Sequence, residues 1–193
     1  MNKLTAADLW KLEDYARERP AFRARVLAHK QARTIRLGAH LTLLFEDRLT
    51  VQYQVQEMLR IERIFEADGI TDELTAYNPL IPDGSNLKAT LLIEYDDVDE
   101  RRRELERLRG IEHDIRLVVE GHPAIVAIAD EDLERSNESK TSAVHFLRFE
   151  LDGAAKAAFR AGARVQLAID HPHYRATSEL DGSHRTALLA DFA

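Results

Sequence analysis

Three side chains of this sequence, Glu62, His145 and His171, have the types and positions that could do chemistry. Residues 51–65 contain no Gly or Pro, and their apolar residues recur with the period of a helix. At 100° per residue these apolar residues form one arc, and Glu62 falls near its middle. A buried carboxylate needs a cation, a hydrogen-bond network, a metal or a proton. We therefore predict that Glu62 is buried beside a specific partner.

The two histidines are predicted to point inward from strands. In the strand predicted over residues 143–151, His145 shares a face with the apolar residues, because successive side chains of a strand alternate between its faces. By the same count, His171 continues the apolar stripe of the strand predicted over residues 164–171. If these strands run antiparallel, the two imidazoles share one end. If they run parallel, the imidazoles lie roughly 20 Å apart, at about 3.3 Å per residue.

One carboxylate and two imidazoles are the ligand set of a nonhaem iron, manganese or zinc site with open positions. The metal hypothesis therefore names Glu62, His145 and His171 as ligands, and it predicts that one of the histidines lies within the shell of Glu62. The alternative is structural: Glu62 pairs with an Arg such as Arg148, and each His is a core residue hydrogen-bonded to the backbone. The residues alone leave both interpretations open.

A second candidate surface is the basic run between Arg17 and Arg36, in which Glu18 is the only acid. Such a run can be a solvated helix face that pairs with acidic segments elsewhere in the chain. It can also bind an anion or an acidic partner, and Arg19, Arg23 and Arg25 are then its contact residues.

Composition excludes several classes of function. The chain has 193 residues, a formal net charge of −7 and no Cys, so thiolate metal sites, iron–sulfur ligation and a cysteine nucleophile are excluded. Any metal must be held by His, Asp and Glu. The acidic balance argues against nucleic-acid binding through bulk charge. No apolar run resembles a signal peptide or a membrane span, which predicts a cytoplasmic protein. Phosphate-binding loops, nucleophile elbows and zincin motifs do not occur.

The elements that must position these residues indicate an α+β fold with helices packed on a mainly antiparallel sheet. The predicted strands alternate polar and apolar residues, which is typical of half-buried antiparallel strands. The amino terminus is predicted to be helical, with one helix from Thr5 to about Arg17 and a second from Pro20 to about Ala32. We expect one domain over residues 1–193, with residues 1–32 as a helical segment packed on it.

Long runs of the sequence carry a family resemblance. They are FEDRLTVQYQVQEMLRIERIF (residues 45–65), TAYNPLIPDGSNLKATLLIEY (75–95), TSAVHFLRFEL (141–151) and DHPHY (170–174). With these runs the chain resembles the bacterial domain-of-unknown-function family 3501 over nearly its whole length. The family is uncharacterised, so the resemblance implies no catalytic residues.

What the resemblance implies is a setting, because genes of this family often neighbour genes for rubrerythrin-like proteins and iron–sulfur reductase subunits. It favours an accessory or partner protein in an iron-linked or peroxide-stress redox system. A small metal-dependent enzyme with a Glu/His site is the alternative, and a structural interaction module is a third.

Overall fold

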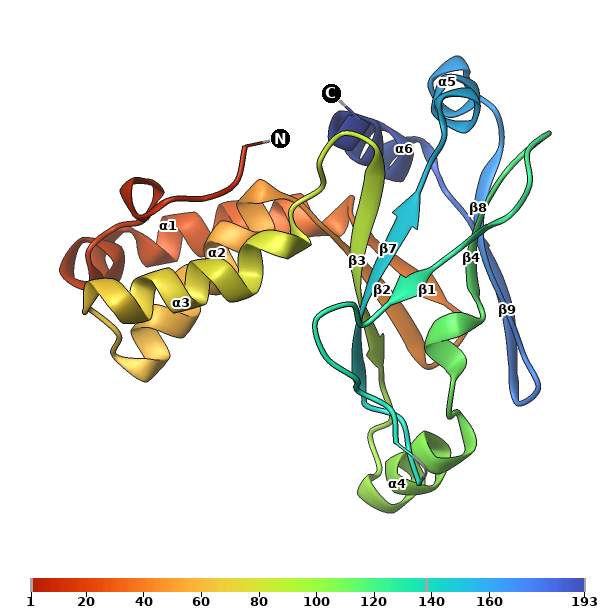
Figure 1. Cartoon of the computed structure of the whole chain (residues 1–193), viewed down its shortest axis with the longest axis horizontal. Coiled ribbons are helices and arrows are strands. Elements are labelled where there is room, and N and C mark those ends of the chain that lie inside the picture. Colours follow the sequence, from red (N-terminus) through yellow and green to blue (C-terminus); the bar gives the residue numbers. More distant parts are fainter. Residues whose placement is uncertain (1, 138, 193) are drawn as a thin grey trace.

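The computed structural model describes residues 2–137 and 139–192. Two antiparallel sheets face each other and a group of helices projects from one of them (Figure 1), which confirms the predicted α+β class. The first sheet has the strand order β1-β2-β3-β7-β6, and the second has the order β5-β4-β8-β9. The strands are β1 (Thr34–Leu37), β2 (Leu41–Glu46), β3 (Asn86–Ile93), β4 (Ile115–Val119), β5 (Ile125–Val126), β6 (Ile128–Ala129), β7 (Val144–Glu150), β8 (Val165–His171) and β9 (Tyr174–Glu179).

The two sheets are joined along both edges. Only Ala127 separates β5 from β6, so one short stretch passes from the second sheet to the first, and the N–H of Ala127 donates to Ile115 O at 2.9 Å. At the other edge, the hydroxyl of Tyr174 on β9 donates to Leu37 O at 2.9 Å. Alternating apolar residues from both sheets fill the space between them as one core. We call this part the β-sandwich.

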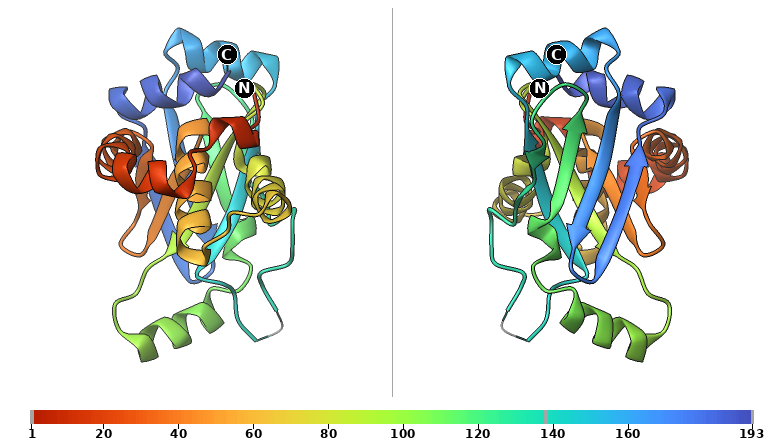
Figure 2. Two further views of the ribbon diagram at one scale, coloured as in Figure 1. Left: turned by 90° about the vertical axis from the view of Figure 1, so that its left-hand side faces the viewer. Right: turned by 90° about the vertical axis from the view of Figure 1, so that its right-hand side faces the viewer.

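Short helices cover the ends of the β-sandwich (Figure 2). Helices α5 (Gly153–Ala161) and α6 (Gly182–Leu189) lie at one end, and α4 (Val98–Arg107) lies at the other. Helix α4 has no buried residue, as expected for its dense Glu and Arg sequence. Asp97, Asp152 and Asp181 cap the three helices, each accepting a hydrogen bond from a backbone N–H of the first turn.

The remaining helices, α1 (Leu12–Gln31), α2 (Arg48–Glu62) and α3 (Ala67–Tyr77), form a helical lobe beside the first sheet (Figure 1). The lobe has two apolar clusters of its own, separate from the core of the β-sandwich. The predicted break at Pro20 is wrong, because α1 runs through it as one helix. Pro20 and Ala16 are both exposed, so the carbonyl that loses its helical partner can bind water. No helix among the described residues combines the length and apolar character needed to cross a membrane.

Candidate metal centre

One buried cluster of ligating side chains stands out among the described residues: Glu112, Asp130 and His145. One ligand atom from each of the three lies within 4.8 Å of the others. Glu112 sits on a short 3-10 turn between α4 and β4, Asp130 follows β6 directly, and His145 is on β7. Three separate segments therefore converge on one point at the end of the β-sandwich nearest α4.

Local backbone features aim these segments at one another. Gly110 has φ +81, a left-handed conformation that suits glycine, and the turn carrying Glu112 begins at that residue. Asp130 has φ +51, which Asp tolerates better than most residues, and the chain turns there out of β6. His145 pairs with Leu91 of β3, so its side chain points into the core as the alternation predicts. It is fully buried.

Both ring nitrogens of His145 have defined partners. Nδ1 lies 2.6 Å from Asp130 Oδ2, and the other oxygen of Asp130 accepts from the N–H of Phe146 at 3.0 Å. Nε2 lies 2.8 Å from Thr141 Oγ1 and 3.0 Å from Ser142 O. Nδ1 thus faces the Asp130 carboxylate, while Nε2 is the ring nitrogen turned toward Thr141, Ser142 and Glu112. A carboxylate holding the far nitrogen of a His is the usual arrangement behind a metal-binding imidazole.

Glu112 is a buried carboxylate with neutral hydrogen-bond donors. It is 2% exposed, and its oxygens accept from the hydroxyl groups of Ser136 and Thr141. Burial by itself would raise its pKa. The hydrogen bonds from Ser136 and from its own backbone, with His145 and His113 nearby, outweigh burial and hold the pKa of Glu112 below its ordinary value. The side chain is therefore an anion at neutral pH.

The charges around the cluster leave a negative surplus. Asp130 pairs with Arg135 at 3.3 Å, but Arg135 also pairs with the carboxylate of Asp132. Among the described residues, the basic groups within 4.0 Å of Glu112 are the imidazoles of His113, at 3.7 Å, and His145, at 3.9 Å. Neither group carries the permanent charge of a Lys or Arg, and a buried carboxylate favours such a positive charge beside it. A bound cation would supply it.

The same groups also resemble a nucleophile relay, because Asp130, His145 and Thr141 are joined in the order acid, imidazole and hydroxyl. The burial of the hydroxyl and the imidazole argues against that chemistry. Thr141 is 1% exposed and His145 is fully buried, so a substrate cannot reach the hydroxyl in this conformation. A metal ion needs far less space than an acyl substrate, and the cluster suits it better.

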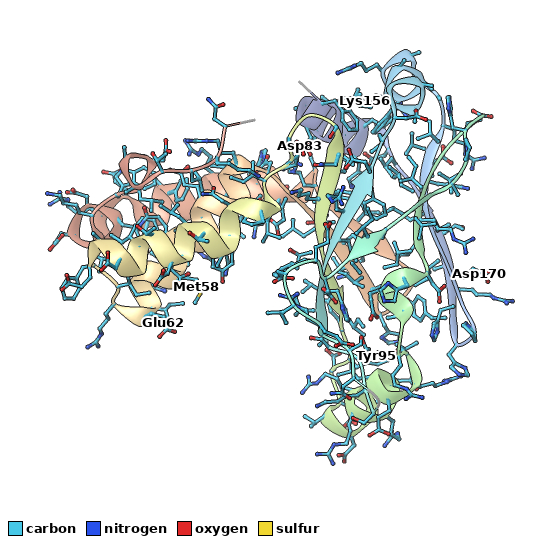
Figure 3. All side chains as sticks on the ribbon, viewed as in Figure 1. Met58, Glu62, Asp83, Tyr95, Lys156 and Asp170 are labelled. Atoms are coloured by element: carbon cyan, nitrogen blue, oxygen red, sulfur yellow. The ribbon has the colours of Figure 1, made fainter. Side chains whose placement is uncertain are left out.

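Glu62 does not join this cluster, and its predicted burial is wrong. It is exposed, at the last residue of α2 and at the end of the helical lobe away from the sheets (Figure 3). The buried face of α2 carries Val51, Val55 and Leu59, whereas Ile61 is 58% exposed. The predicted apolar arc therefore spans two faces of α2. Only the face that carries Val51, Val55 and Leu59, at four-residue spacing, packs inside the helical lobe.

Gln56 is a polar residue that occupies the buried face of α2. It is fully buried. Its side-chain oxygen accepts from Trp10 N at 2.7 Å, and its amide donates to Trp10 O at 3.3 Å. An amide can satisfy a backbone donor and an acceptor together, which makes its burial affordable without a charge partner.

His171 is buried as predicted, at 5% exposure, and has backbone partners. Its Nε2 lies 3.2 Å from Arg109 O, and its Nδ1 accepts from the N–H of His173 at 3.2 Å. His171 and His145 thus contact the same segment, residues 109–112, from the two sheets. This is the shared-end arrangement, but Glu112 lies next to His145 in the place where Glu62 was predicted.

The three arginines of the basic run differ in their surroundings. Arg19 is partly buried and makes two hydrogen bonds to Glu57 of α2, at 2.7 and 2.8 Å. Arg23 and Arg25 are exposed, and the guanidinium of Arg25 lies 5.1 Å from the ring centre of Phe22. Arg19 therefore matches the interpretation in which the run pairs with acids elsewhere in the chain. Arg23 and Arg25 remain the predicted partner surface.

Sequence reasoning singled out His145 but did not identify Glu112 or Asp130 as its partners. Glu112 lies on a 3-10 turn of three residues, too short to produce a helical or strand period. One signal was present, because Glu112 stands between the apolar residues Ile111 and Ile115 at the start of a strand. That signal marks burial without naming a partner.

Comparisons with known proteins place the chain within a family. A search of curated proteins finds no match. A crystal structure of a protein of unknown function from Burkholderia pseudomallei is 52% identical in sequence, covers 100% of both chains and superposes with a TM-score of 0.95. The family described as "Protein of unknown function (DUF3501)" matches residues 3–192. The chain belongs to the DUF3501 family, as its sequence runs indicated.

Proposed function

We propose that this protein binds one divalent transition-metal ion through Glu112 and His145. The observation that supports it is the buried Glu112 carboxylate facing an imidazole whose far nitrogen is held by Asp130. In this proposal His145 Nε2 and Glu112 Oε2, now 3.9 Å apart, are the protein's first two ligands. The hydroxyl of Thr141 and the carbonyl of Ser142, both close to Nε2, are additional oxygen donors.

The donor set limits the metal. It offers one imidazole nitrogen and several oxygens, and the chain has no Cys. Such donors suit iron, manganese or zinc, and they do not suit metals that require thiolate. The described hydroxyl and imidazole groups at the cluster are buried and not accessible to a substrate. We therefore propose that the ion is carried by the protein or stabilises its fold, and enzymatic use of the ion is the second proposal.

For the cellular role, we infer a cytoplasmic accessory protein of an iron-linked or peroxide-stress redox system. Support comes from the family's gene setting and from a metal site of the iron, manganese or zinc type in a chain without Cys. Its proposed partner is a rubrerythrin-like or iron–sulfur protein, and the exposed Arg23 and Arg25 are its proposed contact residues. Copurification of the untagged protein with such a partner, and its loss in an Arg23→Glu, Arg25→Glu variant, tests this role.

Metal analysis of protein purified without a histidine tag tests the site. We expect close to one equivalent of iron, manganese or zinc in the wild type, and a large loss in Glu112→Gln and His145→Gln. Asp130→Asn is expected to weaken binding by about 10- to 100-fold, because it removes the group that orients the imidazole. Glu62→Gln and His171→Asn are matched controls, and both should retain the metal.

Circular dichroism of each variant separates loss of metal from loss of fold. A wild-type protein that stays metal-free after incubation with Fe(II), Mn(II) and Zn(II) would contradict the proposal. So would a folded His145→Gln variant that retains the same metal content.

A further inference from the structure

A cavity of about 290 Å³ lies between the outer face of the first sheet and the helical lobe. Strands β2, β3 and β7 form its floor, and α2 and the end of α3 form its wall, consistent with the position of the lobe beside these strands (Figure 1). Its volume is close to the smallest ligand pockets of proteins, which begin at about 300 Å³. Most of the lining is apolar or aromatic: Leu44, Val51, Tyr77, Leu80, Leu92, Val144 and Phe146.

Glu46 places a carboxylate in this apolar lining. It is 9% exposed, and its side chain stands on the outer face of β2, opposite Lys88 in the register. One oxygen accepts from the hydroxyl of Thr90 at 2.6 Å and the other from Thr50 at 2.5 Å. Both donors are neutral, so they fix the carboxylate without cancelling its charge.

The carboxylate has capacity for a further donor. Two carboxylate oxygens offer about four acceptor positions, and the hydroxyls of Thr50 and Thr90 use two of them. No ion pair joins Glu46 to a Lys or Arg within residues 2–137 and 139–192, and the ammonium of Lys30, which also lines the cavity, lies 5.7 Å from the ring centre of Tyr53. A nearly buried anion in an apolar wall strongly favours a cationic donor.

We propose that this cavity binds a small organic amine with an apolar body. The ammonium group hydrogen-bonds to Glu46, and the body contacts the leucines, Val144 and Phe146. A charge-assisted hydrogen bond is about twice as strong as a neutral one, and it is stronger still where water is excluded. An organic acid of the same shape would place two carboxylates side by side and should be rejected.

Phenethylamine is a suitable probe, because it joins one ammonium to one aromatic ring. Isothermal titration calorimetry of the wild-type protein should show saturable binding, and 3-phenylpropanoate should bind at least about tenfold more weakly. Glu46→Gln should lower the affinity for the amine by about tenfold or more, because it removes the charge. Thr90→Val should lower it less, since it only loosens the carboxylate. Glu62→Gln, an exposed change of the same type, is the control and should bind like the wild type.

Leu92→Trp provides an independent arm, because a larger side chain on the cavity floor should block the amine while leaving Glu46 intact. Thermal unfolding of each variant verifies that it is folded. The proposal is overturned if the wild type does not bind phenethylamine up to about 10 mM. Equal binding of the acid, or undiminished binding by a folded Glu46→Gln variant, overturns it as well.

Discussion

The two carboxylate oxygens of the buried Asp191 have different surroundings. One oxygen pairs with the buried guanidinium of Arg33, and the other is buried without a hydrogen-bond partner among the described residues. Burial raises the pKa of Asp191 to about 6, although Arg33 acts in the opposite direction. The folded protein therefore holds a proton on this carboxyl more tightly than the unfolded chain, whose ordinary pKa is 3.8.

The raised pKa of Asp191 makes the free energy of unfolding depend on pH in a defined direction. Below pH 3.8 Asp191 is protonated in both states, and above about pH 6 it is ionised in both, so its effect changes only between these values. Within that window, the unfolding free energy that it contributes falls as the pH rises. We expect the wild type to lose about 1–3 kcal/mol relative to Asp191→Asn between pH 4 and pH 7. Urea unfolding of both proteins across this range measures it, and parallel pH profiles would contradict the shift.

At the level of single residues, the sequence predicted burial where a strand alternated cleanly. Side chains of a strand alternate between its two faces, so the apolar neighbours of His145 and His171 identified the buried face correctly. The burial predicted for Glu62 is wrong because a helix with apolar residues on two faces does not reveal which face is buried. The exposed Ile61 and Phe65 moved the centre of the predicted apolar arc toward Glu62. The partner of His145 could not be predicted, because Glu112 comes from a turn 33 positions away in the sequence, and only the packing of two sheets brings it there.

Between elements, the contact of α1 with α2 depends on a polar clamp. Glu57 accepts two hydrogen bonds from Arg19 and one from Tyr15, at 2.7 Å. The Arg19 hydrogen bond lowers the pKa of Glu57 to about 2, even though burial acts to raise it. The clamp therefore stabilises the fold fully above the ordinary pKa of 4.5, and this contribution is lost as the pH falls toward about 2.

Arg19→Met is expected to lower the thermal midpoint at pH 7, because it removes two hydrogen bonds to the Glu57 carboxylate and leaves it with Tyr15 and the more exposed Arg60. Arg23→Met, four residues along the same helix and exposed, should leave the midpoint unchanged. Differential scanning calorimetry at pH 7 compares them, and the difference should shrink at pH 2.5, where Glu57 of the unfolded chain is protonated and its folded pKa of about 2 is close. Equal midpoints for the two variants would show that the clamp contributes nothing.

Elements with strong periods were predicted well, and those defined by tertiary contacts were not. The strands predicted over residues 143–151 and 164–171 from alternation match β7 and β8. The strand β9 was missed because its residues, Tyr174–Glu179, alternate exposed and half-buried positions with little apolar character. Its place is set by pairing with β8 and by the hydroxyl of Tyr174 on the opposite sheet. The Pro20 break failed for a similar reason, since packing of α1 on α2 outweighs a local preference.

For the whole molecule, the main question is what couples the helical lobe to the β-sandwich, since their apolar clusters are separate. Arg33 lies at the junction, between the end of α1 and the start of β1, and is 1% exposed. Its guanidinium donates to Phe45 O at 2.8 Å, Glu46 O at 3.1 Å and Ala187 O at 3.0 Å, and it pairs with Asp191. One side chain thus ties the junction to β2 and to the carboxyl-terminal helix.

The start of α2 joins the same network. Asp47 caps α2 through the N–H groups of Leu49 and Thr50, lies 3.5 Å from Arg33, and contacts His29 of α1 at 2.5 Å. Two of the three chain connections between the lobe and the first sheet, α1 to β1 and β2 to α2, therefore pass through ion pairs with Arg33 or its neighbours, and the third runs from α3 to β3. We therefore predict that the lobe and the β-sandwich unfold together as one domain.

Arg33→Met tests this coupling. Removing one partner of a buried ion pair costs about 3–5 kcal/mol, because the stranded Asp191 and Asp47 lose their cation. The loss should also separate two transitions that coincide in the wild type. Trp10, the single Trp of the chain, packs with Tyr15 and Phe22 in the lobe, so its fluorescence reports lobe unfolding, while far-UV circular dichroism reports both parts. The two signals should have the same urea midpoint in the wild type, and in Arg33→Met the fluorescence midpoint should fall below the other.

Arg36→Met, an exposed change on the neighbouring strand β1, is the matched control. It should keep the two midpoints equal and the stability within about 0.5 kcal/mol of the wild type. Two separate transitions in the wild type would mean that the lobe is an independent folding unit. A single transition in Arg33→Met, at lower urea, would mean that the lobe and the β-sandwich are coupled by the cavity walls and the chain connections, with Arg33 contributing only stability.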